Sequence, residues 1–281
     1  MRHNKIVHRR DSGGWHRSMR LRGRKGIREE LEALPQLVVL DASGLKGKWN
    51  EFFGNDKPIH IELGMGKGRF ISRHSVLNPE VNYIGVDMYD ELIRRAAEKA
   101  LEARAEAGQE GYPPNLALLR ANIEGIGEMF APGEIERIYL NFSDPWPKAK
   151  HARRRLTHPR FLEQYSSILN EYGEIHQKTD SRLLFEFSLN SYAETELQLR
   201  NISLDLHRDE VREDLVLTEY EGKFIKQGMP IHRCEAVVGA KALAAYREEK
   251  QARRSREAAK EREDAEKARQ KAGVPLGTGS E

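Results

Sequence analysis

The sequence predicts an α/β protein built on a doubly wound, mostly parallel sheet of seven strands, with an extension at each end of the chain. Strand-like aliphatic runs alternate with helix-like runs from residue 58 onward, and this alternation favours parallel strands with helices on both faces. A glycine-rich turn at 64–68 joins the first strand of the series to a helix. The chain has 281 residues, 38% of them hydrophobic, which suffices for one sizeable domain with tails.

The elements follow from the hydrophobic pattern in chain order. Residues 27–34 predict a short helix that stops at Pro35, and residues 36–40 predict a short strand or an extended arm. The strands of the main series are expected between turn residues, at 58–63, 82–87, 115–120, 136–144, 174–180, 214–220 and 235–241. Helices are expected at 69–77, at 90–107 and within 158–173.

Charge divides the chain into a basic arm (1–26), a folded domain (27–246) and a charged tail (247–281). Residues 1–28 hold ten Lys or Arg against one acid, although the net charge of the whole chain is only +3. Residues 148–160 hold six Lys or Arg and no acid. Such uneven charge indicates either a polyanionic partner or a solvated face. Because the tail lacks an apolar stripe, we expect a solvated helix or disorder there.

Cysteine usage and hydropathy exclude several classes of protein. The single cysteine, Cys234, cannot form an internal disulfide, which favours a reducing cytoplasm. No apolar run is long enough to span a bilayer, and no metal-ligand cluster stands out in the sequence. We therefore expect a cytoplasmic protein that needs neither a membrane nor a metal.

The glycine turn predicts a cofactor site. In ELGMGKGRF (62–70), Gly64, Gly66 and Gly68 follow a strand, at the edge where doubly wound folds bind ligands. The spacing is GxGxG, which departs from the GxGxxG fingerprint of dinucleotide folds. Glu62 precedes the turn, where a carboxylate suits an ammonium group, and Asp87 ends the next strand, where it can accept the hydroxyls of a ribose. Together these residues predict a site for S-adenosylmethionine.

Asn122 and Asp144 follow the third and fourth strands of the main series. Asn122 could hydrogen-bond an adenine edge or cap a helix. Asp144 begins the DPWP segment, in which each proline disfavours a helical conformation for the residue before it, so its carboxylate would point at the reactive methyl group. A carboxylate there would stabilise a purine base that becomes cationic on methylation. Ring nitrogen N7 of guanine fits, and so does an exocyclic amine that would give the acid a proton.

The residues after Asp144 predict contact with RNA. Trp146 could stack on a base or pack beneath its loop. The cations Lys148, Lys150, Arg153, Arg154 and Arg155 follow with no intervening acid. Phosphates are the natural partners of such a row, and binding them would make affinity fall steeply with salt.

Four motifs, ELGMGKGRF, NFSDPWPKAKHARRRLTHPRFL, QKTDSRLLFE and TEYEGKFIKQGMPIHR, give the chain a resemblance to the bacterial tRNA (guanine-N7-)-methyltransferases across residues 19–245. The resemblance implies a class I, Rossmann-like methyltransferase that transfers methyl from S-adenosylmethionine to guanosine 46 in the variable loop of tRNA. It implies that Asp144 is catalytic and that the cofactor contacts Glu62, Asp87, Asn122 and Asp144. It assigns substrate binding to Lys148, Asp180, Thr218, Glu219, Tyr220 and Glu221, and RNA contacts to Lys150, His151, Ala152, Arg153, Arg154 and Arg155.

Alternatives remain open for several of these residues. Asp180 could line the acceptor side next to Asp144 or cap a helix at 181–190, while Glu219 and Glu221 could share one face of a strand or be ordinary surface charges. Asp87 stands where the family more often has Glu. Rival functions are a nucleic-acid methyltransferase acting on an exocyclic amine and a tRNA-binding protein without catalysis. A nicotinamide dehydrogenase fits the glycine spacing least. We expect tRNA as the partner of a monomer or homodimer.

Overall fold

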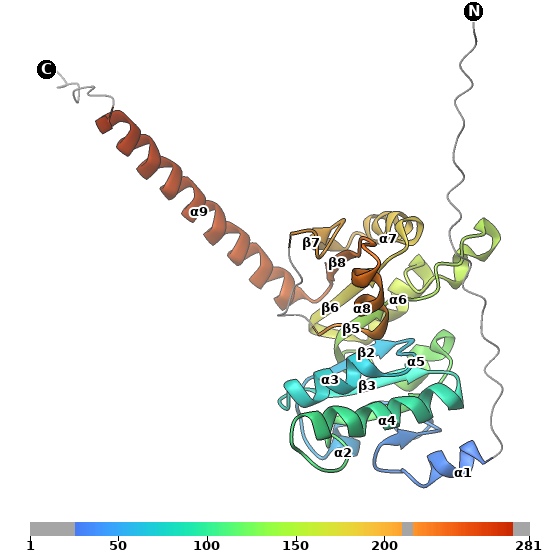
Figure 1. The fold of residues 1–281 in the computed structure, drawn as a ribbon. Helices are drawn as coiled ribbons and strands as arrows, with labels where there is room; N and C mark the ends of the chain where they lie inside the picture. Colours follow the sequence, from blue (N-terminus) through green and yellow to red (C-terminus); the bar gives the residue numbers. More distant parts are fainter. Residues whose placement is uncertain (1–25, 210–215, 272–281) are drawn as a thin grey trace, which may run out of the picture.

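The computed structural model describes residues 26–209 and 216–271, and these residues form an eight-stranded sheet with helices on both faces (Figure 1). The strand order is β1-β4-β3-β2-β5-β6-β8-β7. The strands are β1 (Val38–Val39), β2 (Ile59–Leu63), β3 (Asn82–Asp87), β4 (Leu116–Arg120), β5 (Ile135–Asn141), β6 (Leu169–Thr179), β7 (Gln198–Ser203) and β8 (His232–Val237). Strands β1 to β6 pair in parallel, whereas β8 runs antiparallel to both β6 and β7. The predicted mostly parallel sheet is confirmed, with eight strands where we expected seven.

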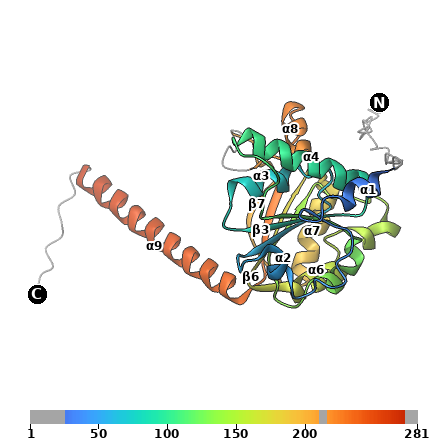
Figure 2. The same ribbon diagram turned by 90° about the horizontal axis from the view of Figure 1, so that it is seen from below.

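The helices divide between the two faces of the sheet, as Figure 2 shows for α3 and α4 against α2 and α6. One core layer joins α1, α3 and α4 to the sheet, and a second joins α2, α5, α6 and α7. The helices are α1 (Ile27–Glu32), α2 (Trp49–Phe53), α3 (Arg69–Leu77), α4 (Asp90–Glu106), α5 (Ile126–Met129), α6 (Pro159–Ile168), α7 (Arg182–Glu194), α8 (Glu219–Lys226) and α9 (Ala240–Lys271), with short 3-10 turns η1 (Ile123–Gly125) and η2 (Ala149–Arg154). Neighbouring residues of one strand enter different layers, as Tyr83 and Ile84 do, because side chains alternate along a strand.

Local sequence explains where the helices of the second layer begin. The ring of His158 accepts a hydrogen bond from the backbone N–H of Arg160, and Pro159 occupies the first helical position of α6. The hydroxyl of Ser181 accepts from the backbone N–H of Leu184 and so caps α7. These starts fix the directions in which α6 and α7 pack back across the sheet.

The prediction of a strand at 214–220 is wrong for the part of this segment that the structure describes. Residues 210–215 lie outside the described chain, and Glu219 and Tyr220 belong to α8 instead. The side chain of Thr218 accepts from the backbone N–H of Glu221, while the Glu221 carboxylate accepts from the backbone N–H of Thr218. This reciprocal pair is a capping box, which starts a helix. The sheet is completed instead by β7, which we did not predict.

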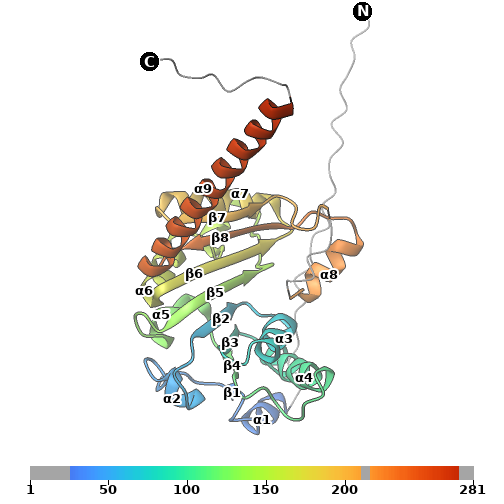
Figure 3. The same ribbon diagram turned by 90° about the vertical axis from the view of Figure 1, so that its left-hand side faces the viewer.

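The two extensions differ in what the structure describes of them. Of the basic arm 1–26, only Gly26 lies within the described residues. Residues 247–271 of the tail belong to α9, which leaves the amino-terminal edge of the parallel strands and extends away from the domain (Figure 1, Figure 3). In the described part of the chain we find no helix with the length and apolarity needed to cross a membrane.

Candidate active site

A cavity of about 580 Å³ opens at the carboxyl ends of the parallel strands. Figure 3 shows this edge of the sheet, where the arrowheads of the parallel strands β5 and β6 point toward α8. The loops after β2, β3, β4 and β5 and the start of α8 form its walls. The residues predicted to bind cofactor or substrate that line it are Glu62, Gly64, Gly66, Gly68, Asp87, Asn122, Asp144, Thr218, Glu219 and Tyr220. Trp146 and Arg154, which were predicted to contact RNA, line it as well. The structure therefore brings together every residue predicted to bind the cofactor and three of those predicted to bind substrate.

The glycine turn makes one wall of the cavity. Gly64, Gly66 and Gly68 all have positive φ angles, of 74°, 57° and 74°, which residues with a Cβ rarely adopt. A Cβ on Gly68 would lie 2.4 Å from the Cβ of Ala96, so this glycine also lets α4 approach the turn. The turn can thus present bare backbone to a ligand.

Glu62 is a buried carboxyl group with one unpartnered oxygen. Only 3% of the residue is exposed, its Oε1 accepts a 2.9 Å hydrogen bond from the Asn141 side chain, and its Oε2 has no partner. Burial raises the pKa of Glu62 to about 8. A buried oxygen of this kind requires a donor or a cation. The site therefore fits a ligand that carries an ammonium group.

Asp87 and Asn122 each have a structural role beside their place in the cavity. Asp87 Oδ2 accepts from the backbone N–H of Gly66 at 3.1 Å and Oδ1 from that of Tyr89 at 3.2 Å, so the carboxylate ties the glycine turn to the end of β3. Burial raises the pKa of Asp87. Asn122 Oδ1 accepts from the backbone N–H of Glu124 at 3.1 Å and caps η1. Asn122 therefore caps a helical turn, as one of its two predicted roles required, and it also lines the cavity.

Asp144 lies on a loop, because β5 ends at Asn141 and not at residue 144 as we expected. The chain leaves the strand through Phe142, which has a positive φ of 52°. Asp144 follows two residues later, is exposed and lines the cavity. Trp146 lines the same cavity, with the guanidinium carbon of Arg154 4.9 Å from its ring centroid and the His151 ring at its edge. An acid and an aromatic ring therefore line the same cavity.

Comparison with known proteins decides the family. Residues 56–234 match the protein-family model described as "Putative methyltransferase". A tRNA (guanine-N(7)-)-methyltransferase of Streptococcus uberis is 50% identical over 218 residues, which cover 78% of this chain and 99% of the relative. A relative of the same name from Geobacillus sp. is 48% identical over 217 residues, covering 77% and 94%. The chain belongs to the tRNA (guanine-N7-)-methyltransferase family.

Solved structures agree on the fold. The 16S rRNA methyltransferase KamB matches with a TM-score of 0.51 at 13% identity, covering 69% of this chain and 93% of that one. A mutant 16S rRNA (adenine(1408)-N(1))-methyltransferase from Catenulisporales acidiphilia, solved with its cosubstrate SAM, matches with a TM-score of 0.50 at 19% identity, covering 72% and 92%. At these identities the likeness shows a Rossmann-like methyltransferase fold.

Three residues predicted for substrate binding do not line the cavity of this tRNA (guanine-N7-)-methyltransferase family member. Lys148 is exposed before η2, and Asp180 follows β6, where Ser181 and not Asp180 caps α7. Glu221 belongs to α8 and is fully buried. Of the residues predicted to contact RNA, Lys150, Arg153 and Arg154 are exposed and His151 and Ala152 are half-buried, but Arg155 is buried, with 6% of its surface exposed. The run HARRR does not distinguish Arg155 from its neighbours.

Glu221 is an anchor for α8 and does not contact the cavity. Both of its oxygens pair with Lys178 Nζ, at 3.1 and 3.0 Å, and its Oε1 lies 3.0 Å from His207 Nε2. Lys178 is buried at the carboxyl end of β6, so the pair fastens α8 to the sheet. Sequence analysis missed Lys178 and His207, although the capping-box spacing of TEYE offered a signal for α8. The anchor holds Thr218, Glu219 and Tyr220 at the cavity.

We expect Lys178→Met to lower the free energy of unfolding by roughly 3–5 kcal/mol, because it leaves a buried carboxylate without its cation. A second change, Glu221→Leu, should recover a large part of that loss. Urea denaturation of the single and double variants measures both effects. Lys241→Met, at the exposed pair with Glu171, is the control and should cost less than about 1 kcal/mol. A double variant less stable than Lys178→Met would contradict the assignment.

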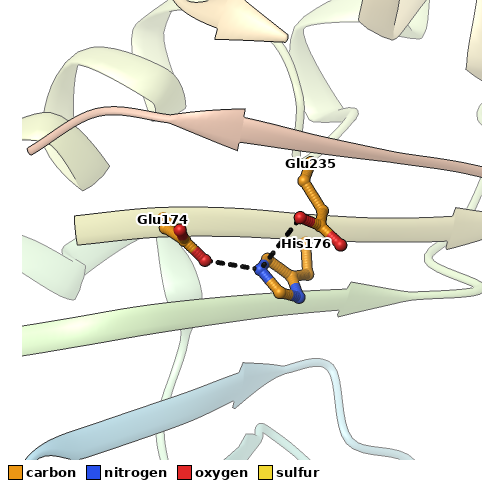
Figure 4. Close-up of side chains that lie close together, drawn as sticks. All are labelled: Glu174, His176 and Glu235. Atoms are coloured by element: carbon orange, nitrogen blue, oxygen red, sulfur yellow. Dashed lines mark hydrogen bonds and ion pairs between the residues drawn. The ribbon is translucent and has the colours of Figure 1, made fainter. Parts of the chain in front are cut away.

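A second cluster, Glu174, His176 and Glu235, has the residue types of a metal site (Figure 4). Its ligand atoms lie within 4.8 Å of one another, but the carboxylates already have cationic partners. Arg200 donates to both carboxylates at 2.7 Å, and Arg137 and Arg233 pair with one each. Since three guanidinium groups surround two carboxylates, a divalent cation would be repelled. The cluster is an ion-pair network that joins β5, β6, β8 and β7.

Proposed function

We propose that this chain transfers the methyl group of S-adenosylmethionine to N7 of guanosine 46 in the variable loop of tRNA. The observation that carries the proposal is the 50% identity to a curated tRNA (guanine-N(7)-)-methyltransferase across 99% of that relative. The exposed Asp144 and the half-buried Trp146 line the same cavity as the buried Glu62, which is consistent with the proposal.

Different residues of the cavity would bind different parts of the cofactor. S-adenosylmethionine, when bound, supplies an electrophilic methyl group on a sulfonium. Glu62, with its unpartnered oxygen, would hold the ammonium group, and the glycine turn would allow the cofactor to approach the backbone. Asp87 would accept the ribose hydroxyls with the lone pairs that Gly66 and Tyr89 leave free.

Trp146 would stack on the target guanine, and Asp144 would accept hydrogen bonds from its edge. Stacking on an aromatic ring contributes roughly 1–3 kcal/mol per base and leaves the edge of the base available for hydrogen bonds. The Asp144 carboxylate would accept from the N1–H and N2–H edge of guanine, and this contact strengthens as methylation makes the base cationic. N7 has a free lone pair, so its attack on the methyl group requires no base.

The proposal is tested by incubating the protein with isotopically labelled S-adenosylmethionine and an unmodified tRNA transcript. We expect one labelled N7-methylguanosine per tRNA, mapped to position 46, and no transfer to a transcript that carries adenosine there. An exocyclic methylated base would favour the rival methyltransferase. Binding of tRNA without transfer would favour the non-catalytic protein.

The exposed cations Lys150 and Arg153 would contact phosphates. Each of Lys150→Ala and Arg153→Ala should therefore reduce the slope of log Kd against log salt for tRNA by about 1, because each removes one displaced counterion. Filter binding at several salt concentrations measures the slope. Lys57→Ala is the matched control, since Lys57 precedes β2 at the opposite edge of the sheet and should leave the slope unchanged. Equal slopes in all variants would refute this assignment.

A further inference from the structure

Arg155 is a buried guanidinium within a row of exposed cations. Its Nε donates to the carbonyl of Pro145 and its Nη2 to the carbonyl of Trp146, both at 3.1 Å. The residue is only 6% exposed, whereas Lys150, Arg153 and Arg154 are exposed. Two of its donors are thus directed at backbone oxygens inside the protein, away from any phosphate at the surface.

The loop that Arg155 contacts cannot stabilise itself by regular backbone hydrogen bonds. Pro145 and Pro147 have no backbone N–H, and the loop belongs to neither a helix nor a strand. Trp146 has a φ of 40°, a left-handed conformation that is unfavourable for a bulky residue and especially for one that precedes proline. Such a conformation persists only where surrounding contacts enforce it. Those contacts include the two hydrogen bonds from Arg155.

Arg155 is itself fixed to helix α7. Its guanidinium carbon lies 4.4 Å from the ring centroid of Phe187 on α7. Two residues further along, the hydroxyl of Thr157 lies 2.7 Å from that of Ser188, also on α7, and both residues are buried. A continuous set of contacts therefore runs from α7 through Arg155 to the backbone of the residues that follow Asp144.

We propose that Arg155 is a positioning residue that holds the Asp144–Trp146 loop in its reactive conformation. The inference rests on the proposed function, because it assigns to Arg155 the placement of the groups that would meet the base. A planar guanidinium can donate to two consecutive carbonyls at once, and the single ammonium of lysine cannot reproduce that geometry. The shape of the side chain is therefore essential, whereas a phosphate contact would depend mainly on its charge.

The charge-preserving variant Arg155→Lys separates these two roles. We expect Arg155→Lys and Arg155→Met both to lower kcat by roughly 10–100-fold, as expected for misplacement of reacting groups by about 1 Å. The Kd for tRNA and its salt slope should change little. At the exposed Arg153, the charge-preserving Arg153→Lys should keep the wild-type salt slope, and Arg153→Met should reduce that slope by about 1. Wild-type kcat in Arg155→Lys, or a slope reduced by about 1 in Arg155→Met, would overturn the proposal.

A second readout needs no RNA and tests the loop directly. In a Trp15→Phe background, the remaining tryptophans are Trp49, which is fully buried, and Trp146. We expect acrylamide to quench the Trp146 fluorescence of both Arg155 variants more strongly than that of the parent, with no change in the Arg153 variants. Unchanged quenching in a folded Arg155→Met protein would overturn the proposal. Should that variant not fold, Arg155→Lys provides the same readout, and unchanged quenching there would overturn the proposal equally.

Different results would refute the proposed function and the positioning role of Arg155. A wild-type protein that transfers no methyl group to tRNA would refute the proposed function, and the quenching test would still report on the loop. A wild-type protein that methylates tRNA, together with a fully active Arg155→Lys variant, would refute only the role of Arg155.

Discussion

Asp144→Asn is expected to reduce kcat by about 10²–10³-fold while the protein stays folded and continues to bind tRNA. The carboxylate would counter the positive charge that the base acquires during methyl transfer, and the neutral amide of Asn cannot. Since Asp144 is exposed on a loop, its replacement by a side chain of the same shape disturbs no buried packing. The expected loss therefore lies in the chemical step and not in folding or RNA binding.

Single-turnover kinetics with saturating tRNA and cofactor measures this effect on chemistry alone. Two controls belong to the experiment. Asp144→Glu retains the charge but shifts it by one methylene, so its rate should lie between those of the wild type and Asp144→Asn. Asp56→Asn makes the same change at an exposed acid before β2, at the opposite edge of the sheet, and should leave the rate unaltered. A rate for Asp144→Asn within threefold of the wild type would refute the catalytic role.

Sequence pattern was sufficient for the residues that sit at strand ends. Glu62 and Asp87 lie at or near the carboxyl ends of strands whose apolar runs are easy to recognise in the sequence. The parallel arrangement of these strands then places both residues at one edge of the sheet. The glycine turn was equally predictable, because its positive φ angles suit glycine. These features depend on local sequence plus a single topological rule.

The remaining features depend on tertiary contacts that local sequence does not reveal. Arg155 differs from Arg154 only in its packing against Phe187 and the loop carbonyls. Lys178 is buried because Glu221 reaches it from a helix 43 positions along the chain. The strand β7 was missed because it lies at the sheet edge, where both of its faces are partly exposed and the hydrophobic alternation is weak.

The TEYE segment (218–221) has a pattern that fits two secondary structures. Its alternation of residue types is compatible with a strand, and its first and fourth residues are also the pair that forms a capping box. Glu221, which was predicted to bind substrate, instead caps the start of α8 and pairs with Lys178. A short polar segment can satisfy both patterns, and the packing of Phe224 in the small cluster beneath α8 favours the helix.

Glu62→Gln is expected to weaken S-adenosylmethionine binding by about 30–1,000-fold, or roughly 2–4 kcal/mol, because it removes the charge that would pair with the ammonium group in a buried site. The fold should tolerate the change. With a pKa of about 8, the Glu62 carboxyl is mostly protonated at pH 7 in the free protein, and a neutral amide resembles it closely. Because this folded pKa lies above the unfolded value, ionisation of Glu62 costs stability between about pH 4.5 and 8. Relative to the wild type, the variant should therefore gain stability as the pH rises through that range.

The raised pKa of Glu62 should also make the affinity for the cofactor depend on pH. An ammonium group beside the carboxyl favours its ionised form, so binding below pH 8 should release about one proton. Wild-type affinity should rise nearly tenfold per pH unit between about pH 6 and 7, where the ammonium group itself stays protonated. Calorimetric titrations in buffers of different ionisation enthalpy measure both the affinity and the released proton.

Glu124→Gln is the matched control for that titration. Glu124 also lines the cavity, but its hydrogen bonds with Arg160 lower its pKa, so it is already ionised throughout the range. The Glu124 variant should retain the wild-type pH slope and proton release, whereas Glu62→Gln should lose both. If the wild type bound the cofactor with no pH dependence, or if Glu62→Gln kept the slope, the unpartnered oxygen of Glu62 would not be the ammonium site, and another acid of the cavity would have to carry that role.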